Sequence, residues 1–210
     1  MTMIVRVRRL ALTAHVVSSV GWLGAVGAFL ALAVVGLNSQ DGLQVRSAYL
    51  AMDLTGWFVI VPLALASLPT GLVMSLGTEW GLFRHYWVVA KLVITVLATA
   101  LLLVHMEPVG HLARVVAETT LAKGEFAGLR VQLVADAGAA LVALLTATAL
   151  SVYKPRGMTP YGRRQLERGA SDRALALSPS SWGRRVGIIL LVLSLLFVIL
   201  HLASGGLRGH

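Results

Sequence analysis

The feature that most constrains this chain is an apolar run from residue 10 to residue 37 that contains no Asp, Glu, Lys or Arg. About 20 residues of this kind cross a hydrocarbon core as a helix. The run is too long for the apolar part of a signal peptide, which has about 7–15 residues, so we interpret it as a retained first span. Four more segments are nearly as apolar, at 54–76, 86–106, 129–152 and 185–204.

These five segments decide the fold class. Lipid offers no hydrogen bonds to a polypeptide backbone, so only helices and closed barrels cross a bilayer. Segments of this length favour helices, and the sequence predicts an all-α integral membrane bundle of five transmembrane helices, with residues 1–210 as one domain. The composition agrees, since 57% of the residues are hydrophobic and 13% are charged, whereas soluble domains average about 45–50% and about 25%.

The distribution of Lys and Arg predicts an orientation, because cytoplasmic loops carry an excess of these residues. The larger group, on one predicted side, consists of Arg6, Arg8, Arg9, Arg84, Lys154, Arg156, Arg163, Arg164, Arg168, Arg173, Arg184 and Arg185. The smaller group consists of Arg46, Arg114, Lys123, Arg130 and Arg208. We therefore expect a multi-pass protein of the bacterial plasma membrane, with its N-terminus in the cytoplasm and its C-terminus outside.

Two loops are long enough to have a role of their own. The charges of the outer segment 107–128 are spaced as in a short amphipathic helix at the membrane interface. The inner loop 153–184 is basic and rich in proline, so we expect a partly disordered cytoplasmic loop held near anionic lipid headgroups. The expected partners are the lipid bilayer and these headgroups, with no nucleic acid. A homo-oligomer or a partner in a membrane complex stays open.

Two prolines mark the second predicted span. Pro62 and Pro69 each lack the backbone N–H that a helix uses, so we expect a bend there. The bend serves helix packing in the simpler interpretation and opens a pocket in the other.

Several kinds of chemistry are excluded or unsupported. The chain has no cysteine, which excludes disulfides, iron–sulfur clusters and thiol catalysis. It has no Walker-type phosphate loop, no G-x-S-x-G elbow and no H-E-x-x-H helix. No catalytic residue can be named, and whether the protein is an enzyme stays open.

The informative residues are ionisable groups at membrane depth, which are costly there and often mark a site. In the first span, His15 shares a helix face with Ser18, Ser19 and Trp22. Trp22 could pack against a ligand plane, with a serine orienting a polar group. The alternative is a buried histidine bonded to a neighbouring carbonyl or serine.

In the third span, Lys91 and His105 lie fourteen residues apart, about 21 Å along a helix and on the same face. With Thr95 and Thr99 they form a polar stripe across the membrane. The stripe suits a cofactor site. It equally suits a helix buried among others, with the threonine hydroxyls bonded to their own backbone and Lys91 reaching the inner phosphates.

A third group lies toward the outer leaflet. His105, Asp136 and His201 have similar predicted depths in three different spans. Two imidazoles could ligate haem iron axially, and two histidines with a carboxylate could bind copper or another divalent metal. The alternative is an Asp–His hydrogen bond that joins two helices.

These residues also carry a resemblance. The segment HVVSSVGWLG, with His15 and Trp22, is similar to the first helix of the CopD-like and HemJ-like bacterial membrane proteins. The segment LPTGLVMSLGTEWGLFRHYWVVAKLVITVLATALLLVH resembles actinobacterial multi-span membrane proteins of unknown function allied to that group. The resemblance covers residues 10–153. It departs from HemJ at Val89, where HemJ has a histidine, and HemJ has four spans.

The resemblance implies two functions. HemJ-type proteins are haem-binding protoporphyrinogen oxidases in which a first-helix histidine and a later lysine matter, and His15 and Lys91 match those positions. CopD-type proteins are linked to copper uptake. The leading hypothesis is therefore a protein that binds b-type haem or porphyrin. The alternatives are a copper or divalent-metal permease and a non-catalytic accessory subunit of a membrane complex. The residues proposed to bind the cofactor are His15, Trp22, Lys91, His105 and His201.

Overall fold

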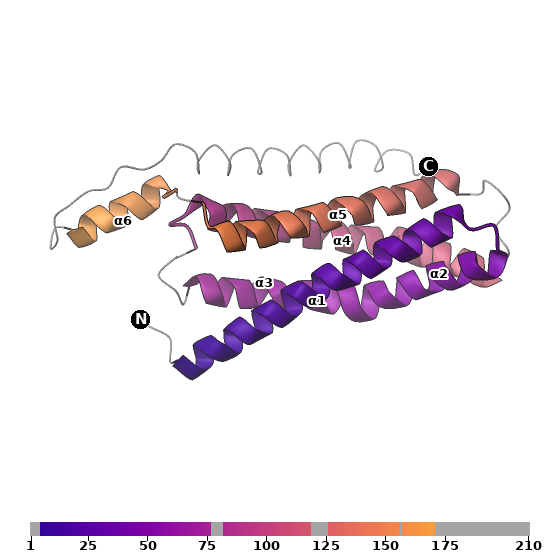
Figure 1. Cartoon of the computed structure of the whole chain (residues 1–210), viewed down its shortest axis with the longest axis horizontal. Helices are drawn as coiled ribbons and strands as arrows, with labels where there is room; N and C mark the ends of the chain where they lie inside the picture. The colour runs from indigo at the N-terminus through magenta and orange to yellow at the C-terminus, as the bar shows by residue number, and fades with distance from the viewer. Residues whose placement is uncertain (1–4, 77–81, 119–125, 156, 171–210) are drawn as a thin grey trace. The chain divides into compact units, whose positions relative to one another are not determined.

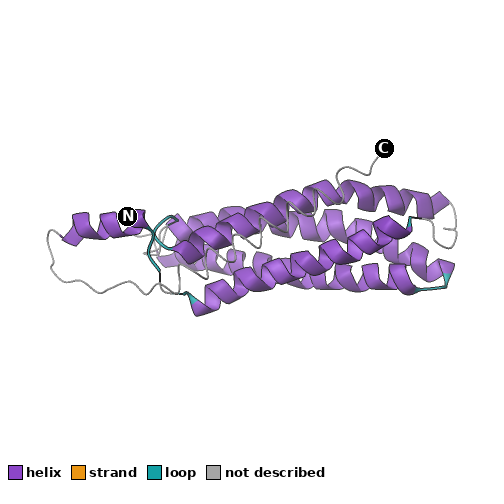
Figure 2. Ribbon diagram, turned by 90° about the horizontal axis from the view of Figure 1, so that it is seen from above, coloured by secondary structure: helices purple, strands orange, loops and turns teal. Residues whose placement is uncertain are grey.

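The computed structural model describes residues 5–76, 82–118, 126–155 and 157–170, and every regular element in these ranges is a helix (Figures 1 and 2). The elements are α1 (Val5–Asn38), α2 (Gly42–Thr55), the π-helical turn η1 (Gly56–Ile60), α3 (Val61–Leu76), α4 (Tyr86–Glu118), α5 (Ala127–Tyr153) and α6 (Pro160–Ala170). The predicted all-α fold class is confirmed for this part of the chain.

Four helices in the described ranges are long and apolar enough to cross a membrane: 6–38, 42–76, 86–118 and 127–153. They contain the first four predicted spans, and the second of them joins α2, η1 and α3 end to end. The chain is a multi-pass membrane protein by the length and composition of these helices. The predicted fifth span, 185–204, lies outside the described residues.

The helices run further than hydropathy predicted. Helix α4 has 33 residues, which is about 50 Å, against a hydrocarbon core of about 30 Å. Residues 107–118 continue α4 through Pro108, so the predicted separate interfacial helix is wrong for this stretch. Residues 42–53, expected as a connection, are helical as well and are capped by Asp41, whose carboxylate accepts a bond of 2.9 Å from the Leu43 N–H. The charges of residues 42–53 lower their hydropathy, so that this helix was not predicted.

The irregularity predicted for the second span is a π-helical turn directly before Pro62. Pro62 cannot donate to the carbonyl four residues earlier, and its ring would crowd that carbonyl. The backbone widens instead, and the Val61 N–H bonds the carbonyl of Gly56, five residues back. Gly56 suits this position because a Cβ there would overlap the end of the Met106 side chain.

The chain divides into two compact units, and α1, α3, α4 and α5 each contribute to both. The first unit contains residues 1–13, 68–97 and 146–210, and the second contains 14–67 and 98–145.

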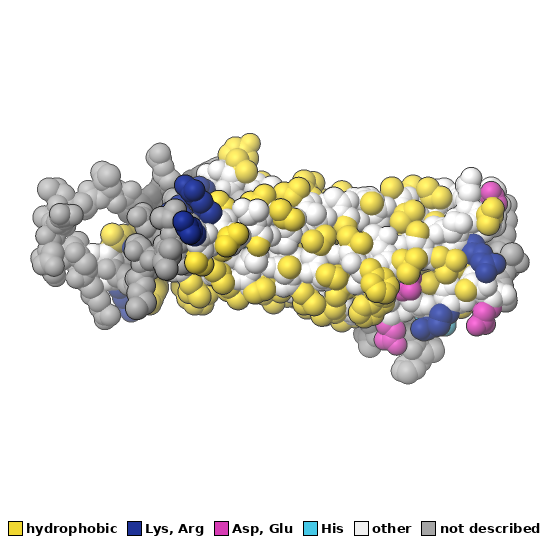
Figure 3. Space-filling model, turned by 90° about the horizontal axis from the view of Figure 1, so that it is seen from below, with side chains coloured by type: hydrophobic (Ala, Val, Ile, Leu, Met, Phe, Trp, Pro, Cys, Tyr) yellow, Lys and Arg dark blue, Asp and Glu magenta, His cyan; other side chains and the backbone are white. Residues whose placement is uncertain are grey.

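The second unit has two buried apolar clusters. One contains Ala33, Val45, Tyr49, Met52, Val61, Met106, Val109, Leu112, Val116 and Leu133. The other contains Trp22, Val26, Ile60, Ala64 and Leu144. Large apolar side chains also face outward, including Phe58, which is 76% exposed, and such side chains cover much of the face seen in Figure 3. An exposed apolar face of this kind is suited to contact with lipid acyl chains.

Candidate functional site

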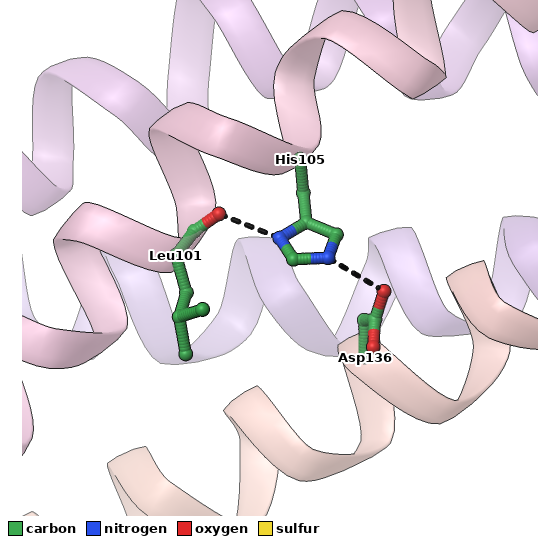
Figure 4. A network of polar contacts seen from close by, with 3 residues as sticks. All are labelled: Leu101, His105 and Asp136. Atoms are coloured by element: carbon green, nitrogen blue, oxygen red, sulfur yellow. Dashed lines mark hydrogen bonds and ion pairs between the residues drawn. The ribbon is translucent and has the colours of Figure 1, made fainter. Parts of the chain in front are cut away.

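An imidazole and a carboxylate meet in the second unit (Figure 4). The Nε2 atom of His105, on α4, lies 3.0 Å from Oδ2 of Asp136, on α5, and each side chain is 16% exposed. The Nδ1 atom of the same ring lies 2.7 Å from the carbonyl oxygen of Leu101. The structure thus brings together two of the three residues predicted for the outer site. His201, the third, lies outside the described residues.

The two contacts determine how many protons this pair carries. A carbonyl oxygen only accepts hydrogen bonds, so Nδ1 of His105 carries a hydrogen and donates it to Leu101. The contact with Asp136 holds one further proton, either on Nε2 as part of an imidazolium–carboxylate pair or on the carboxyl group of Asp136. The pair is electrically neutral as a unit in both cases. This neutrality lowers the cost of placing two ionisable groups in a medium of low dielectric constant.

The helix sequence explains how His105 is held. Leu101 lies four residues before it, one helical turn away on the same face. The ring therefore reaches the carbonyl of its own helix with Nδ1 and presents Nε2 to α5. Histidines that ligate metals are oriented by the same kind of bond from the second ring nitrogen. Here Asp136 occupies the position in front of Nε2.

The site residues predicted in the first span contact other residues of the helices. The Ser18 hydroxyl donates to the carbonyl oxygen of His15 over 3.1 Å, and the hydroxyls of Ser19 and Ser67, on α3, lie 2.9 Å apart. Trp22 is 3% exposed and belongs to the cluster around Ile60. Trp22 thus packs against protein side chains, and its contact with a ligand stays a prediction.

The polar stripe of α4 bonds to protein groups. The ammonium group of Lys91 donates to the hydroxyl of Ser151, on α5, over 2.7 Å, and Ser151 donates to the carbonyl of Ala147 over 2.9 Å. The hydroxyl of Thr95 donates to the carbonyl of Lys91 over 2.8 Å. The self-bonded threonine expected in the second interpretation of the stripe is confirmed here. Lys91 belongs to the first unit and His15 to the second, so their joint inner site stays a prediction.

The sequence did not single out Arg130, which makes several polar contacts in the second unit. From the first turn of α5, its Nη2 atom donates to the carbonyl of Gly36 and, over 3.4 Å, to that of Leu37. Its Nε atom donates to the hydroxyl of Tyr49 over 3.0 Å, and the guanidinium carbon lies 6.0 Å from the centre of that ring. Arg130 therefore caps the C-terminal carbonyls of α1, where a positive charge is favoured.

A metal centre is not formed within the described ranges. They contain no group of three or more His, Cys, Asp or Glu residues placed to hold a metal ion. His105 and Asp136 supply two donors, but 3.0 Å between them is a direct hydrogen-bonding distance. The proposed metal set of His105, Asp136 and His201 stays a prediction, since its third member lies beyond these ranges.

Comparison with known proteins yields no assignment. Neither the family models, nor the curated proteins, nor the solved structures contain a match to this chain.

Proposed function

We propose that this chain is a non-catalytic accessory protein of the bacterial plasma membrane, whose polar residues join its own helices. The observation that carries the proposal is the His105 ring, which is bonded through both of its nitrogens to protein groups. Two further polar pairs likewise join helices of this chain. Lys91 with Ser151 joins α4 to α5, and Ser19 with Ser67 joins α1 to α3.

The proposed topology has five spans, with the N-terminus in the cytoplasm and the C-terminus outside. The charges of the two units support this orientation. The described cationic side chains of the first unit are Arg6, Arg8, Arg9, Arg84, Lys91, Lys154, Arg163 and Arg164. Those of the second are Arg46, Arg114 and Arg130, accompanied by the carboxylates of Asp41, Asp53, Glu107, Glu118 and Asp136. Apart from Lys91, which lies inside a span, the first group is the one that the positive-inside rule assigns to the cytoplasmic side.

A b-type haem or porphyrin protein, related to the CopD-like and HemJ-like group, is the second candidate. The bond from Nδ1 of His105 to Leu101 favours it, because histidines that ligate a metal are oriented by the same kind of bond from the other ring nitrogen. The described residues do not fit the group as they stand. Asp136 fills the ligand position of His105, and protein side chains pack around Trp22.

The test asks whether the protein is bound to a partner in its own membrane. A full-length chain carrying a purification tag, expressed from its native locus, should be cross-linked in the membrane and purified in mild detergent. If the chain is an accessory protein, it should co-purify with one membrane partner at fixed stoichiometry. The partner should be lost after Arg130→Gln, a change that disturbs the fold, and kept after Arg114→Gln. A chain that purifies alone, with a stoichiometric chromophore or metal, contradicts the proposal.

A further inference from the structure

Helix α6 follows the last described span and is fastened to the start of α4, within the first unit. The hydroxyl of Thr159 donates to the carbonyl of Phe83 over 2.5 Å and accepts the N–H of Gly162 over 3.1 Å, so it also caps α6. The N–H of Thr159 donates to the carbonyl of Arg84 over 3.0 Å, and the N–H of Tyr86 to that of Gly157 over 3.3 Å. These bonds tie the two sides of the connection together.

Gly162 determines which side of α6 faces α4. It is buried, and a Cβ at this position would overlap the backbone carbonyl of Arg84. With 3.6 residues per turn, Leu166 lies on nearly the same side of α6 as Gly162, and Arg164 lies almost opposite. The close contact at Gly162 therefore fixes α6 so that Arg164 points away from α4.

The exposed faces of α6 are those of a helix in a membrane interface. Tyr161 is 55% exposed and Leu166 is 42% exposed. Arg163 and Arg164 are exposed beside them. Aromatic side chains near the joined segments are exposed as well, with Phe83 at 55% and Tyr153 at 82%. Aromatic rings beside cations are typical of the headgroup level of a membrane.

The charge of this region points to an anionic partner. The sequence of α6 contains three arginines and one glutamate. Arg84 and Lys154 add two more cations in the adjoining segments. No described side chain of the first unit carries a carboxylate, the side chain of Glu167 being outside the description. Each Lys or Arg at an anionic bilayer surface contributes about 1 kcal/mol of attraction.

We propose that α6 is an interfacial helix, fastened to α4 by Thr159 and Gly162, which holds anionic phospholipid headgroups with Arg163 and Arg164. The sequence predicted such contact for the loop 153–184 as a whole, and this proposal assigns it to one folded helix. It rests on the membrane location and orientation proposed above, and it is independent of the accessory role.

The test uses the full-length protein in nanodiscs of mixed phosphatidylglycerol and phosphatidylcholine. Native mass spectrometry after release counts the lipids of each class that stay bound. The Arg164→Gln change should lower the preference for phosphatidylglycerol about fivefold, and Arg163→Gln with Arg164→Gln about 25-fold. The matched control Arg114→Gln, an exposed arginine of the second unit, should change nothing. An equal preference in all of these proteins would overturn the proposal.

A second pair of variants tests the fastening. Gly162→Leu should displace α6 and lower the same preference, whereas Gly128→Leu, where nothing lies within 4 Å of the new Cβ, should not. Far-UV circular dichroism checks that the spans remain helical. Inorganic phosphate at equal concentration should not displace the lipid, and displacement by phosphate would make this a site for a free anion and overturn the membrane assignment. A lipid preference without any membrane partner would defeat the accessory role alone.

Discussion

The Nε2 atom of His105 lies 3.0 Å from Oδ2 of Asp136, and the opposite nitrogen of the same ring is bonded to its own helix at Leu101. The bond to Asp136 joins α4 to α5. Small residues and hydrogen bonds hold helices together in lipid, because apolar side chains gain little there by leaving acyl chains for one another. A neutral, partly buried His–Asp pair is therefore sufficient as a connection between helices, and needs no ligand to explain it.

The first prediction concerns the strength of that connection. His105→Ala and Asp136→Ala should each lower the free energy of unfolding by about 2 kcal/mol, because each leaves a partly buried polar partner unsatisfied. The double variant should cost less than the sum, with a coupling energy of about 1–2 kcal/mol. Denaturation by sodium dodecyl sulfate, from mixed micelles, measures all four proteins. Additive single effects would show that the pair is not coupled.

The second prediction concerns Arg130 as a cap. Arg130→Lys keeps the charge but loses the planar fork that reaches Gly36, Leu37 and Tyr49 together. We expect a loss of about 1–2 kcal/mol of stability, seen in the same denaturation experiment. Arg114→Lys serves as the control because that side chain is exposed. Equal stability of the two variants would contradict the capping role.

The third prediction uses two glycines of α1. At Gly36 an added Cβ would lie 2.7 Å from Cζ of Tyr49, a ring that is 1% exposed and bonded to Arg130. Gly36→Ala should therefore cost about 1–3 kcal/mol. At Gly27 nothing lies within 4 Å, and Gly27→Ala should stabilise the helix by about 0.5–1 kcal/mol. Thermal melts in detergent compare the two, and a tolerated Gly36→Ala would mean that the contact with Tyr49 is loose.

The spans were predictable because lipid imposes a simple requirement on length and polarity, which the segments around Trp22, Pro62 and His105 satisfy. The pairing of His105 with Asp136 followed from depth alone, since a carboxylate so far inside a span needs a partner. The continuity of α4 through Pro108 to Glu118 was missed, because the helix predicted for residues 107–128 was a separate one at the membrane interface. The helix at 42–53 was missed because charged residues such as Arg46 lower the hydropathy of that segment. Both stretches pack in the cluster around Leu112.

The cap at Arg130 was missed for a different reason. Its acceptors are backbone carbonyls 94 and 93 residues earlier in the chain, and no local pattern reveals such a partner. The sequence signal was an arginine at the start of an apolar segment. Nothing in the sequence linked this arginine to Tyr49. Helix α6 was likewise hidden in a loop rich in proline and glycine. Its N-terminal Pro160 and the capping residue Thr159 were the signals that could have located it.

The most direct test of the account is a spectrum of the purified full-length protein. After expression with added haem precursor, the reduced-minus-oxidised difference spectrum should show no Soret or α band, and the histidine ¹⁵N resonance assigned by His105→Gln should be unchanged by added Cu²⁺. This result would mean that the partner of His105 is Asp136. A Soret band that disappears in His105→Gln, or a resonance broadened by copper, would contradict the account and restore His105 as a ligand.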